Sequence, residues 1–212
     1  MISAVVWDMG GVFRRYFTEP MVDIGRARGW PLERLPLGPT GPVDDPDYRA
    51  MTEGLIEESL YLERLRQRLS DAGIAFDPMT DIDWDGEERP VVWEAIRVIA
   101  ASPLFQAVLT NDASKWMGED WWHTWEPARY FDVVIDVASL PFRKPRPEPY
   151  LEVIERTGFA PDECVFIDDM PVNCRGAEAT GMHSVWFDVL DPDQSVASLL
   201  KMIGYEPGKE LL

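Results

Sequence analysis

A short apolar run near the start of the chain ends in a single carboxylate, and this combination limits the folds the chain can adopt. Ala4–Trp7 is apolar throughout, Asp8 follows it directly, and Gly10 and Gly11 come soon after. A continuous apolar run is typical of a strand buried on both faces of a parallel sheet. The glycines permit a sharp turn and the close approach of a ligand. A helix-capping aspartate followed by turn glycines would give the same pattern, so the rest of the chain must separate the two interpretations.

From residue 89 onward, helical periodicity alternates with short apolar runs. The predicted strands, beyond the first at Ala4–Trp7, cover residues 105–109, 133–137, 164–167 and 184–187. The predicted helices cover residues 91–101, 114–123, 147–157, 173–180 and 194–203. Strands that alternate with helices predict right-handed crossovers and a doubly wound, Rossmann-like parallel sheet. The fold class predicted for the chain is therefore α/β.

The segment 14–88 differs in character, because it shows helical periodicity broken by loops and no strand pattern. Its clearest predicted helix covers residues 47–72 and stops at Gly73. The apolar stripe of this helix consists of Leu55, Leu62, Leu65 and Leu69. We expect residues 14–88 to form a helical cap inserted into an α/β core made of residues 1–13 and 89–212.

Charge and cysteine content narrow the possible partners and setting. With 20 Lys and Arg against 38 Asp and Glu, the net charge of −18 repels nucleic acids and anionic lipid, so neither is an expected partner. No apolar stretch is long enough to span a bilayer, and no signal pattern opens the chain. Cys164 and Cys174 lack zinc-type spacing, which favours free buried thiols in a cytoplasmic protein. A small anionic substrate is still compatible with this net charge, because a local cationic pocket with a metal can outweigh the overall negative field at short range. The chain is expected to be a monomer or a homodimer.

Polar residues follow three of the predicted strands at their carboxyl ends. They are Asp8, the neighbours Thr110 and Asn111, and the acidic pair Asp168 and Asp169. Because the carboxyl ends of these strands share one edge of a doubly wound sheet, we expect the side chains to meet there. Clustered carboxylates in a semi-buried crevice need a compensating cation. Magnesium is the natural choice, since it takes oxygen ligands from carboxylates, water and substrate phosphate.

A basic cluster, Arg143-Lys144-Pro145-Arg146-Pro147, stands out in this acidic chain. Its prolines stiffen the segment and favour a helix start directly after it. A lysine at this point could neutralise a substrate phosphate and the Asp8 carboxylate together. A solvated basic turn would give the same motif, so both interpretations stay open here.

Four segments, in this order, resemble the four motifs of the haloacid dehalogenase superfamily. The segment Trp7-Asp8-Met9-Gly10-Gly11-Val12 resembles the first motif, Val108-Leu109-Thr110-Asn111 the second, Lys144 before Pro145 the third, and residues 165–173 the fourth. The resemblance covers nearly the whole chain, and the helical segment lies where this superfamily carries its cap. The first motif is similar to that of the branch reading Asp-Leu-Gly-Gly or Asp-Leu-Gly-Asn, in which some members resemble sugar-phosphate phosphatases.

The resemblance implies a nucleophile and a metal site. Asp8 would attack phosphorus and form an aspartyl-phosphate that water then hydrolyses. Asp8 would also bind Mg²⁺, together with the backbone carbonyl of Gly10. Asp169 would be a direct ligand of the metal, whereas Asp168 would act through a bound water.

The remaining matched positions would support the same reaction, the hydrolysis of a small phosphomonoester such as a sugar phosphate. Thr110 and the Asn111 backbone would hold phosphate oxygens, and Lys144 would balance charge in the transition state. Asn173 would orient the shell of ligands around the metal. Simpler alternatives exist, because Thr110 and Asn111 fit a helix cap and Asn173 fits a helix start.

Gly10 departs from the family pattern. Phosphatases of this superfamily usually carry a second aspartate there as general acid and base, and the loss of such help costs roughly 10²–10⁴-fold in rate. A substitute such as Asp112, His123 or water, a substrate with a good leaving group, or a weak enzyme would each fit this departure.

The same departure leaves two other functions open. Dehalogenases of the superfamily also lack the second aspartate and use no metal, but they do not need the acidic pair and carry an aromatic residue at the position of Gly10. A catalytically weak binding protein on the same fold is the other alternative, and the intact Asp8, Lys144 and Asp169 count against it.

Four tryptophans, Trp116, Trp121, Trp122 and Trp125, fall within one short stretch with His123 among them. They would suit a stacking wall for a substrate or a self-association patch. Packing of Trp121 and Trp125 onto the sheet explains the same spacing.

Overall fold

The structure of the chain is a computed structural model that describes residues 1–84 and 86–205. The chain divides into two compact units by its internal contacts. The core unit consists of Met1–Phe13 and the chain from Arg89 onward, and the insert unit consists of Arg14–Glu88. The sheet lies in the core unit, whereas the insert unit is built mainly from helices.

Five parallel strands form the sheet of the core unit, in the order β3-β2-β1-β4-β5. They are β1 (Ala4–Trp7), β2 (Phe105–Thr110), β3 (Val133–Asp136), β4 (Cys164–Asp168) and β5 (His183–Trp186). Trp7 of β1 is level with Val108 of β2 and with Ile167 of β4. The residues that follow therefore emerge at one level, at the point where the strand order reverses, which is where ligands bind in such sheets.

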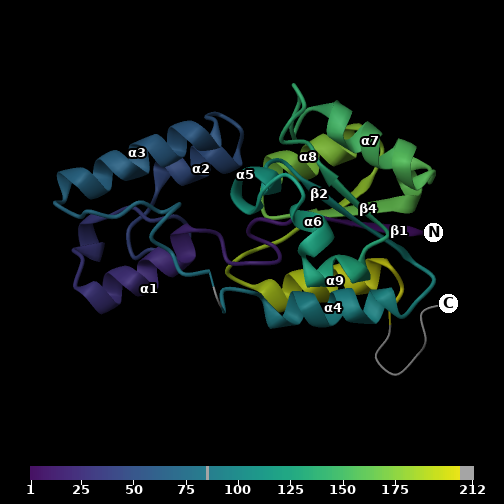
Figure 1. Ribbon diagram of the computed structural model, residues 1–212, viewed down its shortest axis with the longest axis horizontal. Helices are drawn as coiled ribbons and strands as arrows, with labels where there is room; N and C mark the ends of the chain where they lie inside the picture. The colour runs from purple at the N-terminus through teal and green to yellow at the C-terminus, as the bar shows by residue number, and fades with distance from the viewer. Residues whose placement is uncertain (85, 206–212) are drawn as a thin grey trace. The chain divides into compact units, whose positions relative to one another are not determined.

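Four long helices cover the two faces of this sheet, and Figure 1 shows them as two layers with the strands between them. One face carries α4 (Pro90–Ala100) and α9 (Pro192–Met202), and the other carries α7 (Pro147–Thr157) and α8 (Pro171–Ala179). Each of the four has a proline in its first turn, where the missing N–H is harmless. The predicted doubly wound α/β fold is confirmed.

The central strand shows why both faces need a covering layer. Val5 and Trp7 are buried with α4 and α9 on one face, whereas Ala4 and Val6 are buried with α7 and α8 on the other. This alternation is the period of two that a pleated strand imposes on its side chains. The amphipathic α4 meets the sheet through a buried stripe at Val92, Ile96 and Ile99.

Two predicted helices are wrong, because a glycine interrupts each of them. The helix predicted over 47–72 is two helices, α2 (Pro46–Thr52) and α3 (Glu58–Asp71), with Gly54 between them at φ 76°. Leu55, predicted in the apolar stripe, is 77% exposed. Gly118, at φ 91°, likewise divides residues 114–123 between two short helices, because such a backbone conformation ends a right-handed helix. These two are α5 (Ala113–Met117) and α6 (Trp121–Thr124).

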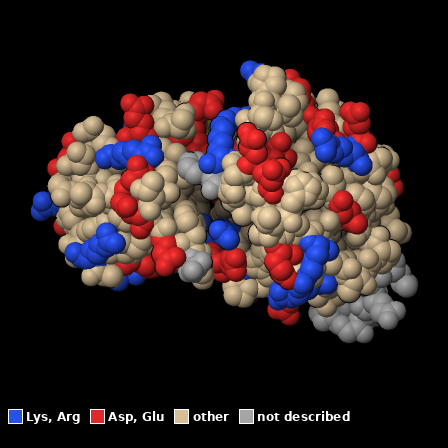
Figure 2. Space-filling model, viewed as in Figure 1, with Lys and Arg blue, Asp and Glu red and all other residues tan. Residues whose placement is uncertain are grey.

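The other helical elements are short or belong to the insert unit. They are α1 (Thr18–Arg28) and the 3₁₀ turns η1 (Leu32–Arg34), η2 (Glu126–Tyr130) and η3 (Pro161–Glu163). Among the described residues, none of the helices combines the length and apolar character that crossing a membrane requires. Acidic side chains are spread over the face drawn in Figure 2. Both cysteines are free and buried, as predicted.

A buried carboxylate holds the insert unit together. Asp45 caps α2 by accepting a hydrogen bond from the Tyr48 N–H at 3.1 Å, and it also accepts from the Gly38 N–H at 2.9 Å. The Tyr61 hydroxyl and the Arg68 guanidinium, both on α3, donate to it at 2.9 and 3.0 Å. Asp45 thus joins a loop to two helices. Burial opposes its ionisation, but these hydrogen bonds outweigh burial and lower its pKa.

We expect Asp45→Ala to lower the free energy of unfolding by about 2–4 kcal/mol, because it leaves buried donors without an acceptor and removes a helix cap. Asp45→Asn, which keeps the shape, should lose less. Because the pKa of Asp45 is lowered in the folded chain, its contribution is present above the unfolded pKa and is lost as the pH falls through the folded pKa. Urea unfolding at about pH 7 and about pH 3 measures this. An Asp45→Ala variant as stable as wild type at the higher pH would disprove the assignment.

Candidate functional site

Lys144 lies between two carboxylates at the carboxyl ends of β1 and β4. Its Nζ is 2.5 Å from Asp8 Oδ1 and 2.9 Å from Asp168 Oδ2, and it donates a third hydrogen bond to the Leu109 carbonyl at 3.0 Å. The Lys144 side chain is only 1% exposed. The solvated basic turn, left open from the sequence, therefore does not describe this lysine.

A third carboxylate completes the cluster. Ligand oxygens of Asp8, Asp168 and Asp169 all lie within 4.8 Å of one another, and the three residues are buried. Three carboxylates beside one ammonium leave an excess of negative charge, which a divalent cation would offset. The donors are all oxygen atoms. Mg²⁺ prefers oxygen ligands, whereas softer metals prefer nitrogen or sulfur. The residues present thus fit a magnesium ion.

Burial and the neighbouring charges together set the protonation of the two central groups, Asp8 and Lys144. It raises the pKa of Asp8 to about 7, with Lys144 opposing the change and Asp168 adding to it. Burial alone would lower the pKa of Lys144, but the neighbouring Asp168 and Asp8 carboxylates raise it. The lysine therefore keeps its charge at neutral pH. Without a cation, Asp8 exchanges a proton near neutrality.

Asp168 is fixed by donors from the start of α8. Asn173 Nδ2 lies 3.1 Å from both of its carboxylate oxygens, and the Met170 N–H donates to Oδ1 at 2.8 Å. The Tyr150 hydroxyl of α7 donates to the Asn173 carbonyl at 2.7 Å and so holds the asparagine in turn. Asn173, predicted to orient the ligand shell, is the third residue of α8 and contacts Asp168 directly.

The loop after β2 contacts the backbone around Lys144. The Lys144 N–H donates to Asn111 Oδ1 at 2.9 Å, and Asn111 Nδ2 donates to the Lys144 carbonyl at 3.4 Å. Thr110, also predicted for phosphate, is buried at the end of β2, and its hydroxyl accepts a 3.5 Å hydrogen bond from the Asp112 N–H. The Asn111 side chain thus positions the lysine segment. Contacts between Thr110 and the Asp8 carboxylate do not appear among the described hydrogen bonds.

The two glycines after Asp8 differ in their surroundings. Gly11 has φ 75°, and a Cβ built on it would lie 2.3 Å from Asp169 Oδ2, so only glycine fits beneath this carboxylate. A Cβ on Gly10 would meet nothing within 4 Å. From the sequence we expected the glycine pair to leave room for a ligand; the approach of the Asp169 carboxylate to Gly11 was not predicted.

We expect Gly11→Ala to destabilise the core unit by about 2–4 kcal/mol and to weaken Mg²⁺ binding, because the new methyl group displaces Asp169 and strains the backbone. Gly10→Ala is the matched control and should change the stability by no more than about 0.5 kcal/mol. Urea unfolding and calorimetric titration with Mg²⁺ measure both effects. Equal behaviour of the two variants would contradict the described packing.

Sequence reasoning missed two further contacts of the site. The Trp186 indole N–H, at the end of β5, donates to the Asp169 carbonyl at 3.0 Å, while the residue remains 52% exposed. The Leu109 carbonyl accepts the third hydrogen bond that Lys144 donates. A backbone carbonyl and an isolated tryptophan carry no spacing signal, so neither was predictable from one sequence.

Two of the four tryptophans, Trp121 and Trp125, belong to the core rather than to this cluster. Trp121 is buried and donates to Asp136 Oδ2 at 3.1 Å, and the Trp125 ring stacks on Phe131 at 5.8 Å. Packing thus explains Trp121 and Trp125. The exposed His123 lies against the Trp122 ring at 3.8 Å. The side chain of Trp116 lies outside the described part of the chain.

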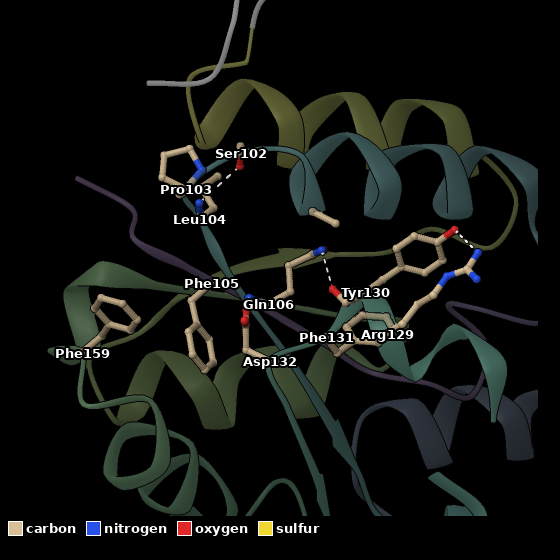
Figure 3. Close-up of a pocket in the computed structure, with 11 residues that line it drawn as sticks. Ser102, Pro103, Leu104, Phe105, Gln106, Arg129, Tyr130, Phe131, Asp132 and Phe159 are labelled. Atoms are coloured by element: carbon tan, nitrogen blue, oxygen red, sulfur yellow. Dashed lines mark hydrogen bonds between the residues drawn. The ribbon is translucent and has the colours of Figure 1, made fainter. Parts of the chain in front are cut away.

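A hollow of about 280 Å³ lies at the other end of β2, close to where the strand begins. Figure 3 shows Phe105, Tyr130 and Phe159 among the residues that line it. Gln106 is fully engaged in structural contacts there, accepting from the Trp7 indole and donating to the Ile96 and Tyr130 carbonyls. The hollow is thus distinct from the carboxylate cluster.

Comparison with known proteins supports the family resemblance. Residues 44–181 match the family model described as haloacid dehalogenase-like hydrolase, which confirms the resemblance. Acyl-CoA dehydrogenase family member 10 of Mus musculus is 31% identical over 119 residues, covering 56% of this chain and 11% of that protein. Phosphoglycolate phosphatase of Escherichia coli K12 is 36% identical over 90 residues, covering 36% of each chain. The matches thus span about a third or less of the curated relatives.

A solved structure shares the whole fold. The HAD-hydrolase YfnB of Bacillus subtilis, crystallised with bound magnesium, aligns with a TM-score of 0.65 at 14% identity. The alignment covers 96% of this chain and 99% of YfnB. At this identity the likeness concerns the fold alone.

Proposed function

This chain belongs to the haloacid dehalogenase-like hydrolases, and we propose that it is a Mg²⁺-dependent phosphatase that acts on a small phosphomonoester through Asp8. The observation that supports this most is the buried cluster of Asp8, Lys144, Asp168 and Asp169 at the carboxyl ends of β1 and β4. Residues 14–88 would act as the cap that selects the substrate. The free buried cysteines agree with a cytoplasmic setting.

Asp8 is the nucleophile in this proposal. The described hydrogen bond from Lys144 to its carboxylate falls on Oδ1, so we assign the attack to Oδ2. A bond forms between this oxygen and phosphorus, while the bond from phosphorus to the leaving oxygen breaks and its electron pair departs with that oxygen. Water then attacks the phosphorus of the aspartyl-phosphate, releases inorganic phosphate and restores the carboxylate.

The groups around Asp8 position the nucleophile and the substrate phosphate and balance their negative charge. Lys144 keeps one Asp8 oxygen in place and contributes a fixed positive charge beside the transferring group. Asp8, the Gly10 carbonyl and Asp169 would hold Mg²⁺, with Asp168 acting through a water. When bound, the ion would stabilise negative charge on the phosphate oxygens. Thr110 and the Asn111 backbone would bind those oxygens at the end of β2.

The alternatives fit the cluster less well. A metal-free dehalogenase site would leave Asp168 and Asp169 facing Asp8 with one lysine to balance three carboxylates. A binding protein without activity would have no need of a buried, fully engaged Lys144 beside a carboxylate of raised pKa. The phosphatase proposal uses all four residues.

The proposal is tested by measuring p-nitrophenyl phosphate hydrolysis with Mg²⁺ and with EDTA. We expect activity that requires the metal and that falls at least about 10²-fold in Asp169→Asn, because one direct ligand loses its charge. Chloride release from 2-haloacids is measured beside it. Haloacid turnover that is independent of metal, with no phosphate release, would replace the proposal by a dehalogenase function.

A further inference from the structure

We infer that the site acts on phosphoryl groups whose leaving oxygen departs without a proton, as in aryl, enol and acyl phosphates, and not on simple alkyl phosphates. The inference rests on the proposed phosphatase function and narrows its substrate class. It follows from what surrounds Asp8 in the core unit.

The leaving oxygen takes the electron pair of the broken bond. An alkoxide is a strong base, so its departure requires a proton from a positioned group, and such help is worth roughly 10²–10⁴-fold. Aryl, enol and carboxylate oxygens carry the charge without that help. A site that offers no proton therefore separates these substrate classes.

Lys144 donates a hydrogen bond to the Asp8 side chain, and the donors of its ammonium group are all in use. An ammonium group has three N–H bonds. They point to Asp8 Oδ1, Asp168 Oδ2 and the Leu109 carbonyl. Donation to a leaving oxygen would break one of these buried contacts, which costs more than an ordinary hydrogen bond returns.

Asp168 offers no proton either. Its Oδ1 accepts from the Met170 N–H and Asn173 Nδ2, and its Oδ2 accepts from Lys144 and Asn173. Because both side-chain oxygens of Asp168 accept hydrogen bonds from N–H donors, neither oxygen carries a proton that it could donate. The residue is 0% exposed and faces these donors rather than a substrate.

Two side chains, His123 and Asp112, were considered from the sequence as substitutes. His123 is exposed on α6, with its ring against Trp122. Asp112 precedes α5, and its N–H bonds to the Thr110 hydroxyl. Neither side chain contacts Asp8 in the hydrogen bonds of the described residues. Gly10, two residues after Asp8, carries no side chain at all.

Gly10 also supplies the test. Because a Cβ there meets nothing within 4 Å and its φ lies outside the left-handed region, the backbone accepts a side chain at this position, and Gly10→Asp is the variant of choice. It places a carboxyl group two residues after the nucleophile. Gly10→Asn is the matched control, with the same size and no acidic proton. Circular dichroism and Mg²⁺ titration check that both variants fold and bind the metal.

The experiment measures kcat/KM for substituted phenyl phosphates of graded leaving-group acidity, acetyl phosphate and an alkyl phosphate. In the wild type we expect kcat/KM to fall at least about 10²-fold from p-nitrophenyl phosphate to the alkyl phosphate. Gly10→Asp should raise the alkyl rate about 10²-fold and flatten the dependence, whereas Gly10→Asn should not.

The failure of the inference and that of the proposed function give different results. Wild-type turnover of alkyl phosphates within about tenfold of aryl phosphates would show a proton donor and overturn the inference, while the phosphatase function stands. Equal alkyl rates in Gly10→Asp and Gly10→Asn would also overturn it. Absence of metal-dependent hydrolysis of every phosphate by the wild type would overturn the proposed function itself.

Discussion

We expect Asp8→Asn to lower kcat for Mg²⁺-dependent p-nitrophenyl phosphate hydrolysis by at least about 10³-fold. The amide has almost the same shape, and its oxygen still accepts the hydrogen bond from Lys144, so the fold is retained. It has no anionic oxygen with which to attack phosphorus. The loss therefore reports on chemistry rather than on structure.

The matched control for this prediction is Asp193→Asn, which removes one carboxylate from an exposed position on α9 of the same unit. Its kcat should equal that of the wild type. If Asp8→Asn kept more than about a tenth of the activity, Asp8 could not be the nucleophile and the mechanism would be wrong.

The stability difference between the wild type and Asp8→Asn should depend on pH. Because burial raises the pKa of Asp8 to about 7, the folded chain binds more protons than the unfolded chain between the unfolded pKa and that value. Without metal, the wild type should thus lose stability relative to Asp8→Asn as the pH rises from about 4 to about 7. Urea unfolding of both proteins in EDTA measures this difference. A difference that does not vary with pH would contradict the described environment of Asp8.

The second large effect is expected for Lys144→Met. Removing the ammonium leaves Asp8 and Asp168 facing each other in a buried space, and breaking such a contact typically costs about 3–5 kcal/mol of unfolding free energy. Methionine keeps the length of the side chain, so the loss arises from charge and hydrogen bonds. We also expect kcat to fall, because the fixed positive charge beside the transferring group is gone.

The effect of Mg²⁺ on the stability of Lys144→Met is a second measurement of this prediction. The cation offsets the same negative charge, so saturating Mg²⁺ should stabilise Lys144→Met more than it stabilises the wild type. Lys201→Met, at an exposed position on α9, is the control and should leave stability and activity unchanged. Unfolding of Lys144→Met at wild-type urea concentrations would show that the lysine does not hold the carboxylates.

The architecture of the core unit was predictable because its signals are local. Apolar runs such as Ala4–Trp7 mark strands buried on both faces, and α7 (Pro147–Thr157) was predicted at its observed bounds from its proline start and the glycine that follows. The helix predicted over 47–72 failed, because apolar spacing continues across Gly54 although the backbone there is left-handed. The spacing of apolar residues indicates which side of a helix is buried, but it does not indicate the backbone angle φ of any one residue.

The site was predictable where it depends on topology. Asp8, Thr110, Asp168 and Asp169 lie at or directly after the carboxyl ends of strands of one parallel sheet, so their shared edge could be inferred before any contact was known. The contact between Asn111 and the Lys144 backbone depends on loop conformation, which no spacing rule gives. The close approach of Gly11 to Asp169 likewise required coordinates.

Trapping the phosphoryl group on Asp8 is the most direct test of the central claim. Wild-type protein is mixed with Mg²⁺ and p-nitrophenyl phosphate for less than one turnover, quenched in acid and reduced with borohydride, which converts an acyl phosphate of aspartate into homoserine. The account predicts homoserine at position 8, found by mass spectrometry of the tryptic peptides, and none in Asp8→Asn or without substrate. Full release of p-nitrophenol with Asp8 unmodified, or homoserine at another aspartate, would contradict it.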